Sequence, residues 1–277
     1  MKMQALQRLG LHSIFFCLMS ITTHHHRFAW TLICFVTGLT HPMTTHCAPY
    51  ELRVYADDTP KKGESELEVI VSVAKPKSTS DGPNGQVIQT LIEYGYGLSQ
   101  GWSIGLELPM SRTAGQSKLD GLKAEMQYIA EHNAHHGWYW GLRGDVGYTS
   151  SPYERQGGNS IGINPIAGYR WSAWHMVVNP SIEIPLSGTG SQPQFQPSAK
   201  IAHAITETRQ LGLEYFSSWG ALSSIRPQRQ RDESIYLVWD ERLLASRWNM
   251  GIGKPLNPSG GSIDKWIVKV GVNLDLD

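Results

Sequence analysis

Acidic and basic residues recur at every second position in several stretches of this 277-residue sequence. Side chains two positions apart on a β-strand point to the same face, so these charges would share one side of a sheet. Such a surface could line a polar passage and select ions, or its charges could pair with one another and fill the space between strands; both interpretations stay open. The predicted set comprises Glu66, Glu68, Glu93, Glu107, Lys123, Glu125, Arg143, Asp145, Glu183, Lys200, Glu214 and Lys269.

Histidines offer the other candidate chemistry. The stretch EHNAHHGW brings together His132, His135 and His136, and imidazole groups bind Zn²⁺ and Cu²⁺. Solvated turn residues are the more common explanation of such a stretch, and the choice stays open. His203 would be the base of a Ser–His hydrolase, but its expected neighbours include no nucleophile. We therefore predict no catalytic site, no enzyme activity, and no cofactor.

The elements that position these residues are predicted to be strands. Residues 266–276 alternate between apolar and polar side chains, with Ile267 as the exception, and the same alternation recurs along the chain. Pro165, Pro180 and Pro197 fall within predicted strands and count against them, because proline has no N–H for a ladder. The alternation predicts twelve strands, at 64–75, 87–98, 102–110, 119–131, 138–148, 160–170, 174–187, 195–206, 209–217, 234–241, 246–254 and 265–277.

The connections between these strands alternate in length. Short ones, such as 98–101 and 206–209, follow every second strand, and longer ones, such as 76–86 and 149–159, follow the others. This rhythm predicts an all-β, antiparallel, up-and-down transmembrane β-barrel with short periplasmic turns and longer extracellular loops, closed by pairing of the first and last strands. A soluble β-sandwich is the alternative.

Tryptophans support the barrel, because membrane barrels carry aromatic girdles where the wall meets the lipid headgroups. Most of them lie at strand ends beside the short turns, and one lies toward the opposite rim. The predicted girdle comprises Trp102, Trp138, Trp171, Trp174, Trp248 and Trp266.

The first 48 residues have the composition of a signal peptide, with basic residues before an apolar run and small residues near position 48. The true start could be Met19. Beyond this leader, 21 basic and 24 acidic residues argue against a nucleic-acid partner. We expect a short periplasmic segment at 49–63 and the barrel at 64–277. All three cysteines, Cys17, Cys34 and Cys47, fall in the leader.

Several phrases, among them IEYGYGLSQGWSIGLELP, INPIAGYRW and VVNPSIEIPLSG, resemble a poorly characterised family of Gram-negative outer-membrane barrels. Its members are often described as transporters or as MetA-pathway of phenol degradation proteins. The resemblance covers nearly all of residues 64–277, implies a barrel, and brings no catalytic motif with it. It also implies that the three prolines lie inside strands.

We therefore expect an exported protein of the Gram-negative outer membrane that forms a passive pore or transporter-like channel for a small solute. The alternatives are a non-conducting barrel that serves envelope structure or partner docking, and a soluble periplasmic β-sandwich. The expected partners are outer-membrane lipid, lipopolysaccharide, which the arginines of the loop at 223–233 could contact, and the barrel-assembly machinery.

Overall fold

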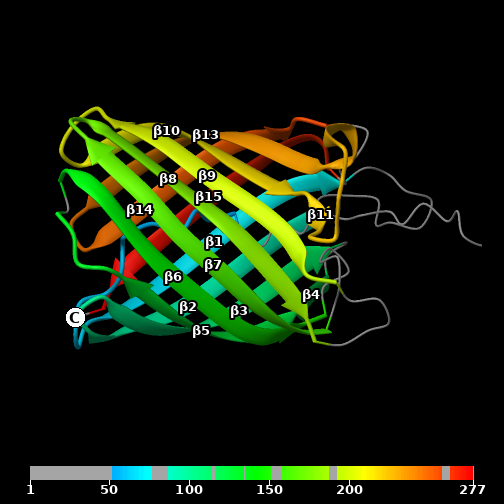
Figure 1. Ribbon diagram of the computed structural model, residues 1–277, viewed down its shortest axis with the longest axis horizontal. Coiled ribbons are helices and arrows are strands. Elements are labelled where there is room, and N and C mark those ends of the chain that lie inside the picture. Colours follow the sequence, from blue (N-terminus) through cyan, green and yellow to red (C-terminus); the bar gives the residue numbers. More distant parts are fainter. Residues whose placement is uncertain are drawn as a thin grey trace, which may run out of the picture. The chain divides into compact units, whose positions relative to one another are not determined.

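The strands close into a single antiparallel barrel in the computed structural model, which describes residues 52–76, 87–113, 116–133, 135–150, 158–186, 192–257 and 263–276 (Figure 1). The predicted leader lies outside these residues. The first long strand pairs with the last, from Glu66 opposite Asp275 to Ala74 opposite Ile267. Among the described residues, this closure leaves no free edge in the barrel wall and excludes the β-sandwich.

Twelve long strands form the wall, each within a few residues of its predicted range. Short β4 (Gln116–Leu119), β11 (Gly220–Ala221) and β12 (Ser224–Ile225), with the 3-10 turn η4 (Gln228–Gln230), extend the end opposite the short turns. The long strands are β1 (Ser65–Pro76), β2 (Val87–Ser99), β3 (Trp102–Thr113), β5 (Gly121–Ile129), β6 (Gly137–Thr149), β7 (Gly158–Trp171), β8 (Trp174–Pro185), β9 (Gln194–Ala204), β10 (Arg209–Ser218), β13 (Asp232–Leu243), β14 (Ser246–Pro255) and β15 (Ile263–Asp275).

The predicted strand at 119–131 is divided between β4 and β5. Between them Asp120 is buried, and its backbone N–H donates to the carbonyl oxygen of Pro109 on β3 at 2.8 Å. β3 therefore pairs with β5 along its first half and with β4 along its last four residues.

The outward face of the wall is apolar. Leu106, Leu122, Val146 and Ile252, from four different strands, are each at least half exposed. Soluble proteins rarely expose so continuous an apolar surface, whereas a barrel wall in lipid requires one. Among the described residues, no helix is long and apolar enough to cross a membrane.

Aromatic rings gather on this outward face near the short turns. Trp102, Trp138, Trp171, Trp174 and Trp248 lie at the strand ends there, and Trp266 lies near the start of β15, toward the opposite rim. Trp138 is 75% exposed. Tyr128 and Tyr169, which the sequence analysis did not include, connect neighbouring tryptophans, with ring centroids 4.8 Å from Trp102 and Trp138 respectively.

The N-terminal segment differs from the expectation of a periplasmic extension. Residues 52–60, here called the lumen segment, lie inside the barrel, where Leu52, Val54 and Tyr55 are buried. The segment reaches the wall near the short turns, where Lys62 bridges to Gly97. A Cβ atom at Gly97 would lie 2.0 Å from the carbonyl oxygen of Lys61, so only glycine permits this approach. The lumen segment lies inside the barrel because the interior offers its side chains apolar contacts and counter-charges that solvent does not.

Candidate functional site

Three glutamates form a row across the inner wall. Glu68 on β1 lies opposite Glu93 on β2, which lies opposite Glu107 on β3. On the next two strands of the wall, Glu125 on β5 lies opposite Asp145 on β6. Like charges directly opposite one another destabilise a sheet, so this part of the wall requires cations.

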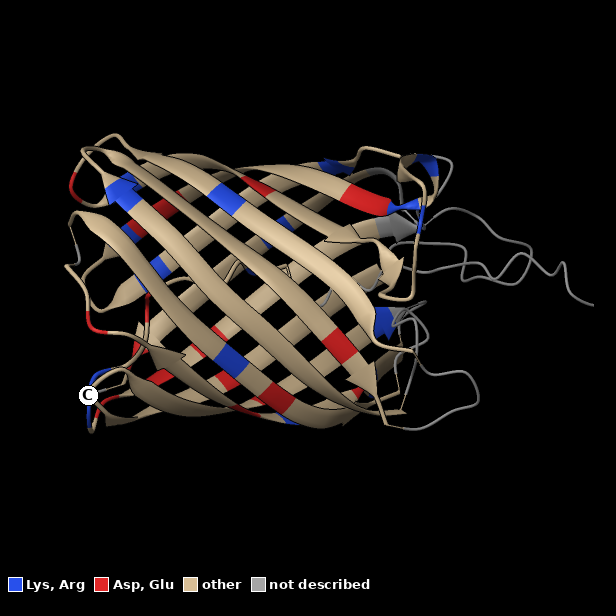
Figure 2. Cartoon of the chain, viewed as in Figure 1, with Lys and Arg blue, Asp and Glu red and all other residues tan. Residues whose placement is uncertain are grey.

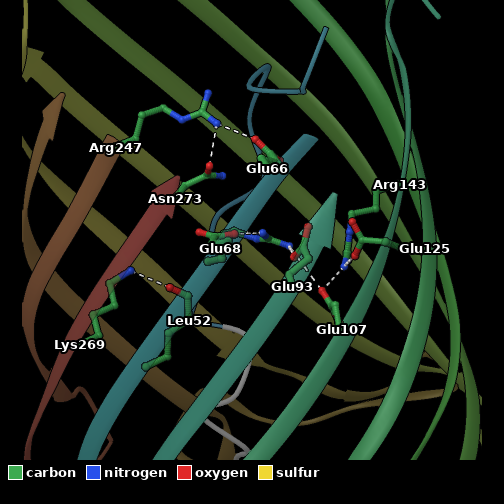
Figure 3. A network of polar contacts seen from close by, with 11 residues as sticks. Leu52, Glu66, Glu68, Glu93, Glu107, Glu125, Arg143, Arg247, Lys269 and Asn273 are labelled. Carbon is green, nitrogen blue, oxygen red and sulfur yellow. Dashed lines mark hydrogen bonds and ion pairs between the residues drawn. The ribbon is translucent and has the colours of Figure 1, made fainter. Parts of the chain in front are cut away.

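Two arginines supply them, and with the five carboxylates they form the arginine network. Figure 3 labels Glu68, Glu93, Glu107, Glu125 and Arg143 of this network. Arg53 of the lumen segment pairs with Glu68, with Glu93 at 2.5 Å and with Glu107 at 3.4 Å. Arg143 of β6 is fully buried and pairs with Glu107 and Glu125, and more distantly with Asp145 at 3.6 Å. The arginine network is acidic, because five carboxylates outnumber the two guanidinium groups. Lys123 of β5, which is buried and lies opposite Glu107, adds one further positive charge beside it.

Carboxylate oxygens of Glu93, Glu107 and Glu125 lie within 4.8 Å of one another, the only group of three potential metal ligands so close among the described residues. Arg53 and Arg143 form ion pairs with all three of these carboxylates, so ion pairing accounts for their proximity.

A second cluster, the lysine network, lies on the opposite wall. Lys200 of β9 bridges Glu214 at 3.1 Å and Asp240 at 2.8 Å. Lys269 of β15 pairs with Glu214 and donates to the carbonyl oxygen of Leu52 at 2.6 Å, which attaches the lumen segment to this wall (Figure 3). Asn249 of β14 donates to both Asp240 and Glu214.

Asp57 attaches the lumen segment near the short-turn rim. Arg170 at the end of β7 pairs with it at 2.5 Å, and His132 Nε2 donates to it at 2.8 Å. Burial would raise the pKa of Asp57, but the hydrogen bond and positive charge of Arg170 outweigh it and hold that pKa below the ordinary aspartate value. Asp57 therefore stays ionised at neutral pH.

The three histidines of the stretch EHNAHHGW differ in their contacts. His132 binds the lumen segment, and its Nδ1 lies 2.9 Å from the carbonyl oxygen of Ala130. His135 and His136 are exposed in the turn. The group of three close potential metal ligands described above consists of glutamates and includes none of these histidines, so it gives no support to a metal site in this turn.

Tyr55 occupies the centre of the lumen segment. Its ring lies under two guanidinium groups, those of Arg143 at 4.1 Å and Arg53 at 4.8 Å. Its backbone pairs with the side chain of Asn179 on β8: the Tyr55 N–H donates to Oδ1 at 2.8 Å, and Nδ2 donates to the Tyr55 carbonyl oxygen at 2.9 Å. Asn179 is fully buried.

The remaining predicted lumen residues also lie on the inward face. Glu66 pairs with Arg247 of β14 at 2.6 Å (Figure 3). Glu183 of β8 lies opposite the buried Gln194 of β9. Figure 2 shows acidic and basic positions on neighbouring strands along the barrel wall. The structure thus brings most of the predicted residues together as ion pairs, and it places Lys123 and Glu183 on the same inward face.

Sequence reasoning missed the partners from the lumen segment and from remote strands, namely Arg53, Tyr55, Asp57, Asn179, Asp240 and Arg247. Arg53 and Asp57 belong to ELRVYADD, in which polar and apolar residues mix. That mixture could have indicated an extended segment with a buried face, but nothing in it indicates a lumen.

A cavity of about 390 Å³ lies beside the lumen segment. Its lining includes Leu52, Arg53 and Val54 of the lumen segment and Lys200, Glu214 and Lys269 of the wall. Glu207 and Thr208 of a short turn also line it, so it reaches the short-turn rim. The lumen segment therefore leaves open space on one side of the interior.

His203 lies on the outward face of β9. Its ring packs against Trp174, with centroids 4.6 Å apart, and it lies opposite Leu211 of β10. Neither neighbour can act as a nucleophile, so these contacts do not build the Ser–His pair of a hydrolase.

No family model and no curated protein matches this sequence. Among solved structures, the chain is similar to the NanC porin, with a TM-score of 0.55 at 10% identity over 76% of this chain and 100% of that one. The COG4313 outer membrane channel from Pseudomonas putida F1 gives a TM-score of 0.54 at 12% identity, covering 82% and 100% of the two chains. The KdgM porin gives 0.53 at 8% identity, covering 76% and 99%. These similarities establish that the chain has the fold of an outer-membrane β-barrel.

Proposed function

We propose that this protein is an outer-membrane channel for a small solute, exported through its leader, and that the lumen segment closes the channel. The observation that carries the proposal is a barrel with an apolar exterior and an interior lined by charged side chains. Proteins of similar fold are described as porins or as an outer membrane channel, which supports the same function.

Cation preference follows from the charges of the arginine network. With Arg53 in place, five carboxylates face two guanidinium groups and the buried ammonium group of Lys123. When the lumen segment withdraws, Arg53 leaves with it and Glu68, Glu93 and Glu107 lose a counter-ion. The open lumen would then attract cations more strongly than anions.

A non-conducting barrel is the second candidate, favoured by the satisfied ion pairs of the interior. Lys200, Lys269, Glu214 and Asp240 compensate one another without a solute. A barrel filled in this way would serve envelope structure or partner docking and would carry no current.

Single-channel recording in a planar bilayer distinguishes the two, using residues 49–277 and a variant beginning at residue 64. A channel closed by its lumen segment predicts rare openings of the longer protein and sustained, cation-selective current from the shorter one. Charge reversal at Glu93 in the shorter variant should change its selectivity. Silence from both proteins, once heat-modifiable mobility on a denaturing gel shows that they are folded, would leave the non-conducting barrel.

The finer family assignment, to the transporter-like MetA-pathway of phenol degradation proteins, is also a proposal. It is supported by the sequence phrases quoted above and by a fold similar to that of the COG4313 channel. Conduction of the truncated variant would agree with a transporter-like role.

Lipid, lipopolysaccharide and the assembly machinery remain proposed partners. Of the loop arginines, Arg226 pairs with Asp232 at 3.6 Å, and Arg231 donates to the carbonyl oxygen of Arg226 and lies over the ring of Trp219. Arg229 is exposed and is the arginine best placed to meet a lipopolysaccharide phosphate. Loss of lipopolysaccharide binding in Arg229→Gln would support that contact.

A further inference from the structure

Three prolines lie side by side in the barrel wall. Pro165 of β7 is level with Pro180 of β8, which lies opposite Pro197 of β9. The β7–β8 ladder is complete from Ser160/Pro185 to Ile163/Ile182, then stops, and resumes at Ala167/Val178 in the same register. Because the register is unchanged, the interruption is a loss of ladder pairs and not a bulge.

Beside Pro165 and Pro180, the interruption affects only the β7–β8 ladder. The β8–β9 ladder runs through Pro180/Pro197, and the β6–β7 ladder runs through Leu142/Pro165. Antiparallel strands alternate between pairs that exchange hydrogen bonds and pairs that do not, and proline removes a bond only from the first kind. We call the affected stretch, residues 164–166 of β7 with residues 179–181 of β8, the seam.

Asn179 lies at the inner side of the seam. Its Nδ2 donates to the carbonyl oxygen of Pro165 at 3.4 Å, a long contact to an acceptor whose opposite residue, Pro180, has no N–H. The same side chain makes both hydrogen bonds to the backbone of Tyr55, and its Oδ1 also accepts from Ser198 Oγ at 3.3 Å. One buried amide therefore joins the weakest described part of the β7–β8 ladder to the lumen segment.

We propose that Tyr55 stabilises the seam through Asn179, so that withdrawal of the lumen segment and local separation of β7 from β8 are one coupled transition. If Tyr55 leaves, the buried Asn179 amide loses two partners. A buried amide without partners is costly, so the side chain reorients and the contact to Pro165 is lost. This inference concerns the wall and holds whether or not the barrel conducts.

Hydrogen exchange of the folded protein in micelles, read by mass spectrometry, tests the coupling. In Tyr55→Pro, which removes the N–H donated to Asn179, amides within 163–167 and 178–182 should exchange about fivefold to tenfold faster, the change expected for one lost hydrogen bond. Adding Pro180→Val should restore slow exchange, because valine supplies an N–H at the seam. Pro197→Val is the matched control and should not restore it, since the β8–β9 ladder already runs through Pro197 and this residue does not face β7.

Reciprocity provides a second measurement that does not depend on the folding of Tyr55→Pro. Coupling requires that a stabilised seam also hold the lumen segment more firmly, so Pro180→Val alone should slow exchange of the peptide covering residues 52–58. Unchanged exchange of that peptide would overturn the proposal. The proposal would also be overturned if residues 52–58 of Tyr55→Pro exchanged rapidly while the amides of the seam stayed protected.

Discussion

Replacing Arg53 by glutamine should release the lumen segment from the wall. Arg53 is the counter-ion of Glu68, Glu93 and Glu107, which are at most 16% exposed, and its own side chain is 19% exposed. Removing one partner of a buried ion pair costs about 3–5 kcal/mol, and partial exposure of Arg53 favours the lower value, about 3 kcal/mol. Since about 1.4 kcal/mol changes an equilibrium tenfold, the segment should leave the lumen roughly 150 times more often.

Single-channel recording measures this as the fraction of time that the protein conducts. A wild-type protein open on the order of one part in a thousand would become open on the order of one part in eight in Arg53→Gln. Lys61→Gln is the matched control, because Lys61 belongs to the same N-terminal stretch but its pair with Glu64 is exposed, and it should behave as wild type. Glu93→Gln added to Arg53→Gln should restore part of the closed state by reducing the repulsion within the glutamate row.

An Arg53→Gln protein with the open fraction and thermal midpoint of wild type would refute this reasoning. It would mean that the ion pairs of Arg53 do not hold the segment, and that Lys269, Asn179 and Arg170 suffice. Arg53→Lys separates charge from geometry, since lysine keeps the charge but cannot reach several carboxylates with one planar group.

Three further predictions follow from the same contacts. In the variant beginning at residue 64, Glu93→Gln should move the reversal potential in a KCl gradient toward zero, and an unchanged potential would place selectivity elsewhere. Because the pKa of Asp57 is lowered in the folded protein, its contribution is complete above the ordinary aspartate pKa of about 3.9 and is lost as pH falls through the lower folded value. The open fraction of the wild-type protein should therefore increase below about pH 4, whereas the open fraction of Asp57→Asn should not show this increase. Equal pH profiles of the two proteins would contradict the role of Asp57. Glu214→Gln would leave Lys200 and Lys269 facing each other, so heat-modifiable gels should record a fall in stability of about 3–5 kcal/mol, whereas Glu241→Gln, at the short-turn rim, should change nothing.

The wall could be predicted from the sequence because a two-residue period gives each strand an inner and an outer face. Residues 266–276 illustrate this: Trp266 and Val270 are exposed and Lys269 is buried. The exceptional Ile267 is buried in the same apolar cluster as Leu52, Val54 and Tyr55 of the lumen segment. The prolines that counted against three strands lie within them after all, at the cost of the interrupted β7–β8 ladder.

The state of the interior could not be predicted in the same way. Alternation indicates that Glu214 points inward, but its partners Lys200 and Lys269 lie on other strands at sequence separations that no local pattern encodes. The lumen segment lacks the regular two-residue alternation of apolar and polar side chains, and its position depends on contacts with β7, β8 and β15. Whether charges line a passage or neutralise one another is decided by these long-range contacts.

The position of the lumen segment also constrains the order of events during biogenesis. The segment leads directly into β1, whose pairing with β15 completes the cylinder, and it touches Arg170, Asn179 and Lys269 from within. If β1 and β15 join last, the segment must already lie among its partners, or it must thread afterwards through the short-turn opening beside Gly97. Insertion and internal docking then become two kinetic steps, and a freshly inserted barrel with an empty interior would be a transient leak that the cell must keep brief.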